Sequence, residues 1–210
     1  MSAPPGNDAQ ARGSTEAVTA TPGVGRPPRS VRLLVRCIDG VSEWTGRFTA
    51  WLIIPLILVI SYEVFVRYAF NAPTIWAFEL QFMLYASMFM LGAAYTLLYG
   101  EHIRTDILYN RWSVRWQGVV DATLYLLFYF PGIALFLWAG WDFAYRSWVI
   151  RELSEFSPWR PPVYPLKMVI PVTAALLLLQ GISELVKSLY AAVTGGRYEA
   201  AIHRDHEEAL

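Results

Sequence analysis

The chain has 210 residues, of which 55% are hydrophobic and only 16% charged, and its mean hydropathy is +0.35. Soluble proteins carry roughly 25% charged residues, so this composition excludes an ordinary water-exposed domain. The formal net charge of zero argues against nucleic-acid binding, and the single cysteine, Cys37, excludes a disulfide within the chain.

Residues 1–30 are rich in Pro, Gly, Ala, Ser and Thr. Such a segment buries too little apolar surface to offset the entropy of ordering, so we expect a disordered cytoplasmic tail here. The segment holds no apolar run of the kind found in a secretory signal, so we do not expect a cleaved precursor.

Residues 31–47 mix apolar and charged positions at helical spacing. The apolar positions recur every three or four residues: Val31, Leu34, Val35, Ile38, Val41 and Trp44. The charged positions fall on the other face: Arg32, Arg36, Asp39, Glu43 and Arg47. This pattern predicts an amphipathic helix, which we expect to lie in the membrane interface. The alternative is a solvated helix packed on another subunit.

Four long apolar stretches follow, over residues 48–66, 75–99, 119–141 and 163–186. A helix needs about 20 residues to cross the hydrocarbon core, and each stretch meets that requirement. Alternation at period two, the mark of a transmembrane barrel, is absent. The sequence therefore predicts an all-α integral membrane protein with four transmembrane helices, in a membrane domain over residues 48–190. Residues 191–210 are expected to form a cytoplasmic C-terminal tail.

Lysine and arginine are divided unequally between the two sides of this arrangement. One side, with both termini and the second loop, holds Arg12, Arg26, Arg29, Arg32, Arg36, Arg47, Arg104, Arg111, Arg115, Lys187, Arg197 and Arg204. The other side holds Arg67, Arg146, Arg151, Arg160 and Lys167. Because the side richer in Lys and Arg stays in the cytoplasm, the prediction is that both termini are cytoplasmic.

Few side chains suggest chemistry. The three histidines, His102, His203 and His206, lie outside the predicted spans, which leaves no axial pair for a membrane haem. No Gly-rich phosphate-binding loop with its lysine is present. His102 and Asp106 stand four apart, as metal ligands on a helix can, but we favour a helix boundary, with Thr105 or Asp106 as the cap of the next helix. We therefore expect no catalytic residue, no metal and no cofactor.

Glu63 and Glu79 are the most informative charges, because ionisable groups at membrane depth are costly. Both lie near the outward ends of their predicted helices rather than at the midplane. Glu63 precedes Arg67 by four residues, the favourable order for an ion pair on a helix. The short turn after Arg67 is expected to bring Glu79 close to it as well. We favour structural pairing; direct involvement in transport is the alternative.

Two further features suggest contacts with neighbours. Small residues seven apart, Ala86 with Ala93 and Ser87 with Ala94, form a stripe on which another helix can pack closely. That helix belongs either to this chain or to a partner. The outward loop over residues 142–162 is a candidate docking site for a soluble partner, although an ordinary interfacial loop has a similar sequence.

Two segments resemble a known family. The first carries the pattern R-Y-x-x-N-x-P-x-x-W-x-x-E in the residues Arg67, Tyr68, Asn71, Pro73, Trp76 and Glu79. The second carries H-x-R-x-D in His102, Arg104 and Asp106. Together they resemble the DctQ-like small membrane subunit of tripartite ATP-independent periplasmic (TRAP) transporters. The resemblance covers roughly residues 33–190, and the first pattern is its specific part.

The resemblance implies a transporter of three parts in the bacterial inner membrane. A periplasmic receptor would capture an organic acid or similar small solute. A large membrane subunit of roughly twelve spans would carry the substrate path and the sodium sites, and this chain would support it. Two other functions remain open at this point: a stand-alone four-helix proton-coupled exporter, and a membrane anchoring or assembly protein.

Overall fold

The computed structural model describes residues 28–99 and 112–196, and its regular structure there is helical. The helices are α1 Arg29–Trp51, α2 Ile53–Phe70, α3 Ala77–Leu98, α5 Val114–Leu124, the π-helical turn η1 Tyr125–Tyr129, α6 Phe130–Val149 and α7 Tyr164–Thr194. Four helical segments are long and apolar enough to cross a membrane: Arg29–Phe70, Ala77–Leu98, Val114–Val149 and Tyr164–Thr194. The predicted all-α chain with four transmembrane helices is confirmed.

The helices extend further than the apolar stretches that predicted them. Helix α6 continues to Val149, so the outward loop expected from residue 142 begins only after that residue. An ion pair on the helix surface, Arg146 to Asp142 at 2.9 Å, accompanies the extension into polar sequence. Helix α7 continues to Thr194 and ends at Gly195, whose φ of 72° is the left-handed conformation favoured at helix ends. Hydropathy marks only the lipid-facing part of a helix, so it underestimates these lengths.

The third predicted span is one bent rod made of α5, η1 and α6. Its π-helical turn, Tyr125–Tyr129, stands directly before Pro131. A proline lacks the N–H that an α-helix needs at that position, and local π geometry is a common accommodation in membrane helices. The Tyr129 hydroxyl donates a hydrogen bond of 2.8 Å to the Leu177 carbonyl of α7, which ties the bend to its neighbour.

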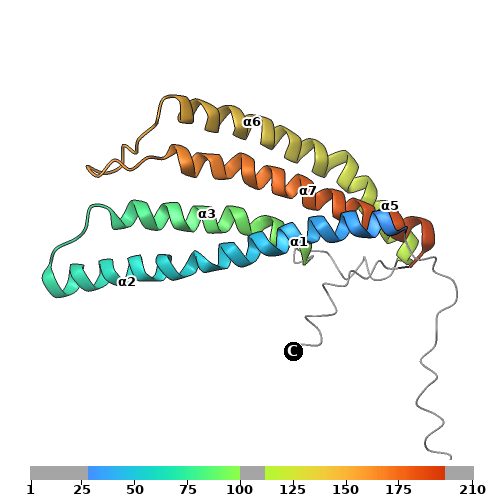
Figure 1. Cartoon of the computed structure of the whole chain (residues 1–210), viewed down its shortest axis with the longest axis horizontal. Helices are drawn as coiled ribbons and strands as arrows, with labels where there is room; N and C mark the ends of the chain where they lie inside the picture. The colour runs from blue at the N-terminus through green and yellow to red at the C-terminus, as the bar shows by residue number, and fades with distance from the viewer. Residues whose placement is uncertain (1–27, 100–111, 197–210) are drawn as a thin grey trace, which may run out of the picture.

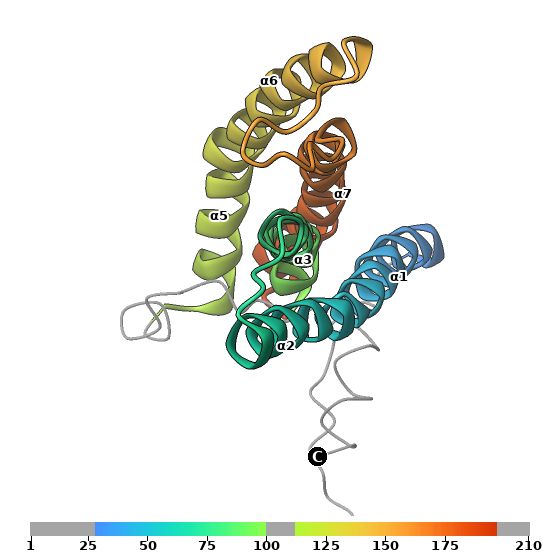
Figure 2. The ribbon, with the colours of Figure 1, turned by 90° about the vertical axis from the view of Figure 1, so that its left-hand side faces the viewer.

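Toward the turns the four spans form an open row rather than a closed bundle, whereas at the other end α1 packs against both α3 and α7. Helix α7 packs against α6 and α5 on one side and against α3 on the other, and α3 packs against α2. The end view in Figure 2 shows α7 and α3 in the middle, with α6 and α2 on the outside. The turns between α2 and α3 and between α6 and α7 lie at one end, which we call the hairpin end (Figure 1). The starts of α1 and α5 and the end of α7 lie at the opposite end.

Small side chains dominate the buried apolar core. The described residues with buried apolar side chains are Val35, Leu56, Ala77, Ala94, Leu97, Leu98, Ala122, Ala144 and Ala174. Large side chains such as Phe65, Phe89 and Trp138 are instead exposed on the outside. Membrane helices associate through close backbone approach at small residues, while their large apolar side chains face lipid or a partner. The exposed apolar surface is therefore that of a membrane-embedded subunit.

Helix α1 buries a face that combines part of the predicted apolar positions with a charged one. Val35, Asp39 and Ser42 are buried against the rest of the chain, whereas Trp44 and Phe48 point outward and are more than half exposed (70% and 54%). Asp39, which the sequence placed on the charged face together with Arg32, Arg36, Glu43 and Arg47, is instead buried against the rest of the chain. The reason is that α7 offers polar partners on the facing side, described below.

Helices α1 and α2 are nearly continuous, with one interruption at Leu52 (Figure 1). Pro55 explains the interruption, because it has no N–H to donate to the carbonyl four residues earlier. At Leu52 the backbone bond switches to the Thr49 carbonyl, at 3.0 Å. Cys37 lies on α1 and is exposed. Whether α1 lies in the membrane interface stays a prediction.

Candidate functional site

Polar side chains of the described residues gather in three clusters, and each cluster joins two segments of the chain. The first, the α1–α7 clasp, consists of Asp39, Ser42, Gln180, Ser183, Glu184 and Lys187. The second, the turn cluster, consists of Glu63, Arg67 and Thr74. The third, the loop joint, consists of Glu79 and Ser154.

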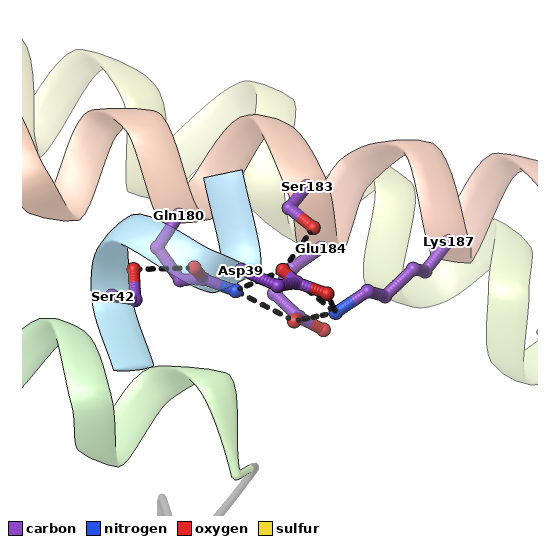
Figure 3. Close-up of polar contacts among 6 residues, drawn as sticks. All are labelled: Asp39, Ser42, Gln180, Ser183, Glu184 and Lys187. Atoms are coloured by element: carbon purple, nitrogen blue, oxygen red, sulfur yellow. Dashed lines mark hydrogen bonds and ion pairs between the residues drawn. The ribbon is translucent and has the colours of Figure 1, made fainter. Parts of the chain in front are cut away.

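Asp39 is the centre of the α1–α7 clasp (Figure 3). Its Oδ1 accepts hydrogen bonds from Ser183 Oγ at 2.6 Å and from Gln180 Nε2 at 3.1 Å. Its Oδ2 lies 3.0 Å from Lys187 Nζ. The Asp39 side chain is fully buried, so α7 replaces the hydration that this carboxylate would otherwise lose.

Gln180 bonds to residues of both helices of the clasp. Its Oε1 accepts a hydrogen bond of 2.7 Å from Ser42 Oγ, and its Nε2 also donates to Glu184 Oε1 at 3.2 Å. Lys187 Nζ lies 2.8 Å from Glu184 Oε1. The amide is fully buried and uses both its oxygen and its nitrogen. The clasp thus fixes the rotation of α1 about its axis relative to α7.

Sequence reasoning missed the clasp, although a signal was present. Gln180, Ser183, Glu184 and Lys187 follow the spacing i, i+3, i+4, i+7, which places them on one face of a helix. A polar stripe on an otherwise apolar helix indicates a buried polar partner. The partner, Asp39, was not recognisable, because it stands among the charges of an amphipathic segment.

The turn cluster closes the connection between α2 and α3. Glu63 Oε1 accepts bonds from Arg67 Nη2 at 2.6 Å and Nε at 3.1 Å, within one helix. Glu63 Oε2 accepts from the backbone N–H of Thr74 at 3.1 Å and from the Thr74 hydroxyl. One carboxylate therefore holds the start of the return segment against the end of α2. Arg67 itself is largely exposed, so it is the peripheral member of the cluster.

Four other residues of the R-Y-N-P-W-E pattern shape this turn or flank it. Asn71 ends α2 with φ of 50°, the left-handed conformation common at helix ends, and the N–H groups of both Asn71 and Ala72 bond back to the Val66 carbonyl, the latter at 3.4 Å. Pro73 follows, as proline often does after a helix end. Trp76 precedes α3 and stacks on Tyr62 of α2, with ring centroids 5.7 Å apart. Tyr68 is 82% exposed and faces outward.

The loop joint connects the two hairpins. Glu79, in the first turn of α3, is buried, and its Oε1 accepts a hydrogen bond of 2.8 Å from Ser154 Oγ. Ser154 belongs to the connection between α6 and α7 and is anchored by its own N–H on the Pro161 carbonyl at 2.8 Å. The expected approach of Glu79 to Arg67 is wrong in this respect: among the described residues, Glu79 bonds to Ser154 and forms no ion pair.

An ion pair also bridges the α6–α7 connection. Lys167 Nζ lies 2.5 Å from Glu152 Oε2, and the backbone of Glu152 accepts from Val163 N–H at 3.0 Å. The hydrogen bond from Lys167 holds the pKa of the Glu152 carboxyl below its usual range. The stability that this ion pair contributes is fully present at pH values above the ordinary pKa of a glutamate. It is lost as the pH falls through the lowered pKa of Glu152.

Three predicted residues, His102, Arg104 and Asp106, lie outside the described residues. The described chain next to them is held by Tyr99, whose hydroxyl donates a bond of 2.5 Å to Glu43 Oε2. Burial and this bond raise the pKa of Tyr99 above its usual range, so the phenol stays protonated and keeps donating.

All three clusters join helices or loops, and their carboxylates are held by donors of this chain. Such an arrangement positions segments relative to one another. A family model described as "Tripartite ATP-independent periplasmic transporters, DctQ component" matches residues 56–190 of the chain. The match includes the turn cluster, the loop joint and the α7 side of the clasp. No curated protein matches the chain.

Proposed function

Since the chain belongs to the DctQ component family of tripartite ATP-independent periplasmic transporters, we propose that it supports the large permease subunit of such a transporter in the bacterial inner membrane. The complete transporter imports a small organic solute, an organic acid, and a sodium gradient drives the uptake. A periplasmic receptor delivers the solute. This chain supports the large subunit and does not itself form the substrate path.

The open row of helices is the observation that carries this proposal. A transport path needs polar groups along its length inside the membrane. The polar clusters of the described residues instead hold helices and loops of the chain to one another. Helices α2 and α6 leave most of their apolar surface uncovered, so whole helix faces are available to a large membrane partner.

The charge distribution supports an arrangement with both termini in the cytoplasm. At the hairpin end, Arg67, Arg146 and Lys167 are each in an ion pair. At the opposite end, Arg29 and Arg36 form no ion pair with any residue of the described segments. Arg151 and Arg160 at the hairpin end form no ion pair with the described residues either, so ion pairing alone does not distinguish the two ends. The side of both termini holds more lysines and arginines, and the side richer in them is retained in the cytoplasm. The hairpin end is therefore assigned to the periplasm, where it faces the receptor.

Deletion of the subunit tests the proposal. Cells without this chain are expected to lose solute uptake, while the purified receptor still binds its solute with unchanged affinity. The affinity-tagged chain is expected to co-purify with a much larger membrane protein. Uptake at the wild-type rate in the deletion strain would contradict the assignment, and so would a tagged chain that purifies without a membrane partner.

A further inference from the structure

Three arginines lie on one side of the first turns of α1. Arg29, Arg32 and Arg36 follow the spacing i, i+3, i+7, which aligns them on one side of the helix. All three are exposed, and together with Leu33 they line a surface pocket of about 270 Å³. Among the described residues, the lining of this pocket thus consists of three arginines and one apolar residue.

No acidic group of the described residues compensates these charges. Arg47, on the same side of α1, is paired with Glu43 at 2.9 Å, whereas Arg29, Arg32 and Arg36 form no ion pair there. An uncompensated cluster of this kind attracts anions. Arginine in particular binds phosphate through two parallel N–H···O bonds, which gives it geometric selectivity as well as charge.

The side of α1 next to the arginines is apolar and uncovered. Leu33, Trp44, Phe48 and Trp51 are 54–70% exposed, and they extend along the helix away from the arginine pocket. A helix with an exposed apolar face beside a basic stripe is suited to the boundary between acyl chains and headgroups.

Helix lengths place the arginines outside the hydrocarbon core. Helix α2 has 18 residues, or about 27 Å, which already covers most of the roughly 30 Å of hydrocarbon. Helix α1 continues from it for 23 more residues. The first turns of α1, at the far end from α2, therefore lie outside the hydrocarbon core, at or beyond the level of the phosphates.

We propose that Arg29, Arg32 and Arg36 form a binding site for the phosphate of an anionic phospholipid, of the phosphatidylglycerol type. With α1 lying along the membrane interface, as its amphipathic sequence predicts, the acyl chains of the lipid lie along Leu33 and the exposed aromatic side chains that follow on α1. The site belongs to this chain alone, so it does not depend on the transported solute or on the transport role.

Binding of short-chain lipids to the purified full-length chain in a neutral detergent tests this site. The probes are dioctanoyl phosphatidylglycerol, dioctanoyl phosphatidylcholine and inorganic phosphate. The wild-type chain is expected to prefer the anionic lipid, and the preference should weaken as ionic strength rises. Each arginine near a membrane surface contributes about 1 kcal/mol, so the triple variant R29Q/R32Q/R36Q should bind phosphatidylglycerol on the order of 100-fold more weakly.

A matched variant at the hairpin end, R146Q/R151Q/R160Q, removes the same charge from three exposed arginines and should bind phosphatidylglycerol like the wild type. Equal binding of both lipids by the wild-type chain would overturn the proposal, as would undiminished binding by the first triple variant. Inorganic phosphate that competes as well as the lipid would also overturn it, by showing a small-anion pocket. The lipid preference of the wild-type chain and its salt dependence test the site even if the first triple variant is poorly expressed.

Discussion

Lys187 compensates two carboxylates at once in the α1–α7 clasp, because its ammonium lies 3.0 Å from Asp39 and 2.8 Å from Glu184. The members of the clasp therefore differ in how much stability is lost when each is replaced. Without Lys187, two neighbouring carboxylates lose their cation in a buried place. Without the Asp39 charge, Lys187 and Glu184 still form a balanced pair.

The variants Lys187→Met and Asp39→Asn separate these two cases. Removal of one partner from a buried ion pair costs about 3–5 kcal/mol, and we expect Lys187→Met to lower the unfolding free energy by that amount. Asp39→Asn should cost clearly less, since an asparagine oxygen still accepts from Ser183. The measurement is denaturant unfolding in mixed micelles. Arg47→Met is the control and should cost less than about 1 kcal/mol, because the Arg47 side chain is 72% exposed and Glu43 keeps its hydrogen bond from Tyr99. Equal losses for Lys187→Met and Asp39→Asn would contradict this assignment of roles.

The loop joint depends on one hydroxyl. Ser154→Ala leaves the buried carboxylate of Glu79 without the donor that it has among the described residues. A buried acceptor without its donor costs about 1–3 kcal/mol, and the thermal midpoint of the purified subunit should fall accordingly. Ser157→Ala removes a hydroxyl of the same loop whose one hydrogen bond with the described residues is the one that it accepts from the Trp159 N–H. If the two variants melted alike, the joint would not contribute to stability.

Between elements, α5 approaches the backbone of α7 so closely at Gly118 that no room is left for a side chain. A Cβ on Gly118 would lie 2.5 Å from the backbone nitrogen of Ala192 and 2.6 Å from the carbonyl oxygen of Ser188. Backbone atoms cannot rotate away as a side chain can. Only a glycine therefore permits this crossing, and α5 is positioned by it.

Gly118→Ala is expected to destabilise the subunit by about 1–3 kcal/mol, because α5 must move away from α7. Gly132→Ala, on the same long rod, is the matched control, since nothing lies within 4 Å of its added Cβ. Alanine favours a helix over glycine by about 1 kcal/mol, so Gly132→Ala should be neutral or slightly stabilising. Thermal unfolding of both variants in one detergent compares them. An equally stable Gly118→Ala subunit would show that the contact is not tight.

The four transmembrane helices could be predicted from the sequence, but the way they pack against one another could not. Apolar runs of adequate length predict four helices, because the bilayer imposes that length on any chain. The Glu63 and Arg67 side chains were expected to meet because both lie on one helix. The clasp and the loop joint could not be predicted, since Asp39 and Gln180, or Glu79 and Ser154, meet only through the tertiary arrangement. The end of α6 at Val149 was missed because hydropathy does not register a polar helix end.

At the scale of the whole molecule, the row has two chemically different ends. The hairpin end combines the turn cluster with the loop joint, so the two loops there are held to the helices and, through Glu79 and Ser154, to each other. The opposite end gathers the starts of α1 and α5 and the end of α7 (Figure 1). We expect the hairpin end in the periplasm and the opposite end, with both termini, in the cytoplasm.

Reporter fusions test this orientation. An enzyme that is active only in the cytoplasm should be active when fused after Leu210 and silent when inserted within residues 71–74. The expected result follows from the greater number of lysines and arginines on the side of both termini. A periplasm-specific reporter at the same two positions is the control and should give the opposite pattern. Activity reversed at both positions would invert the topology.

The exposed position of Cys37 gives this chain a built-in probe site. It is the single cysteine of the chain, and its side chain points away from the protein on α1. A thiol-reactive fluorophore can therefore be attached to the wild-type sequence at one known place, without mutagenesis. Quenching by nitroxide lipids, with the quencher in the headgroup or deep in the acyl chain, then reads the depth of α1 directly. Strong quenching from the headgroup and weak quenching from the deep position would place this helix in the interface.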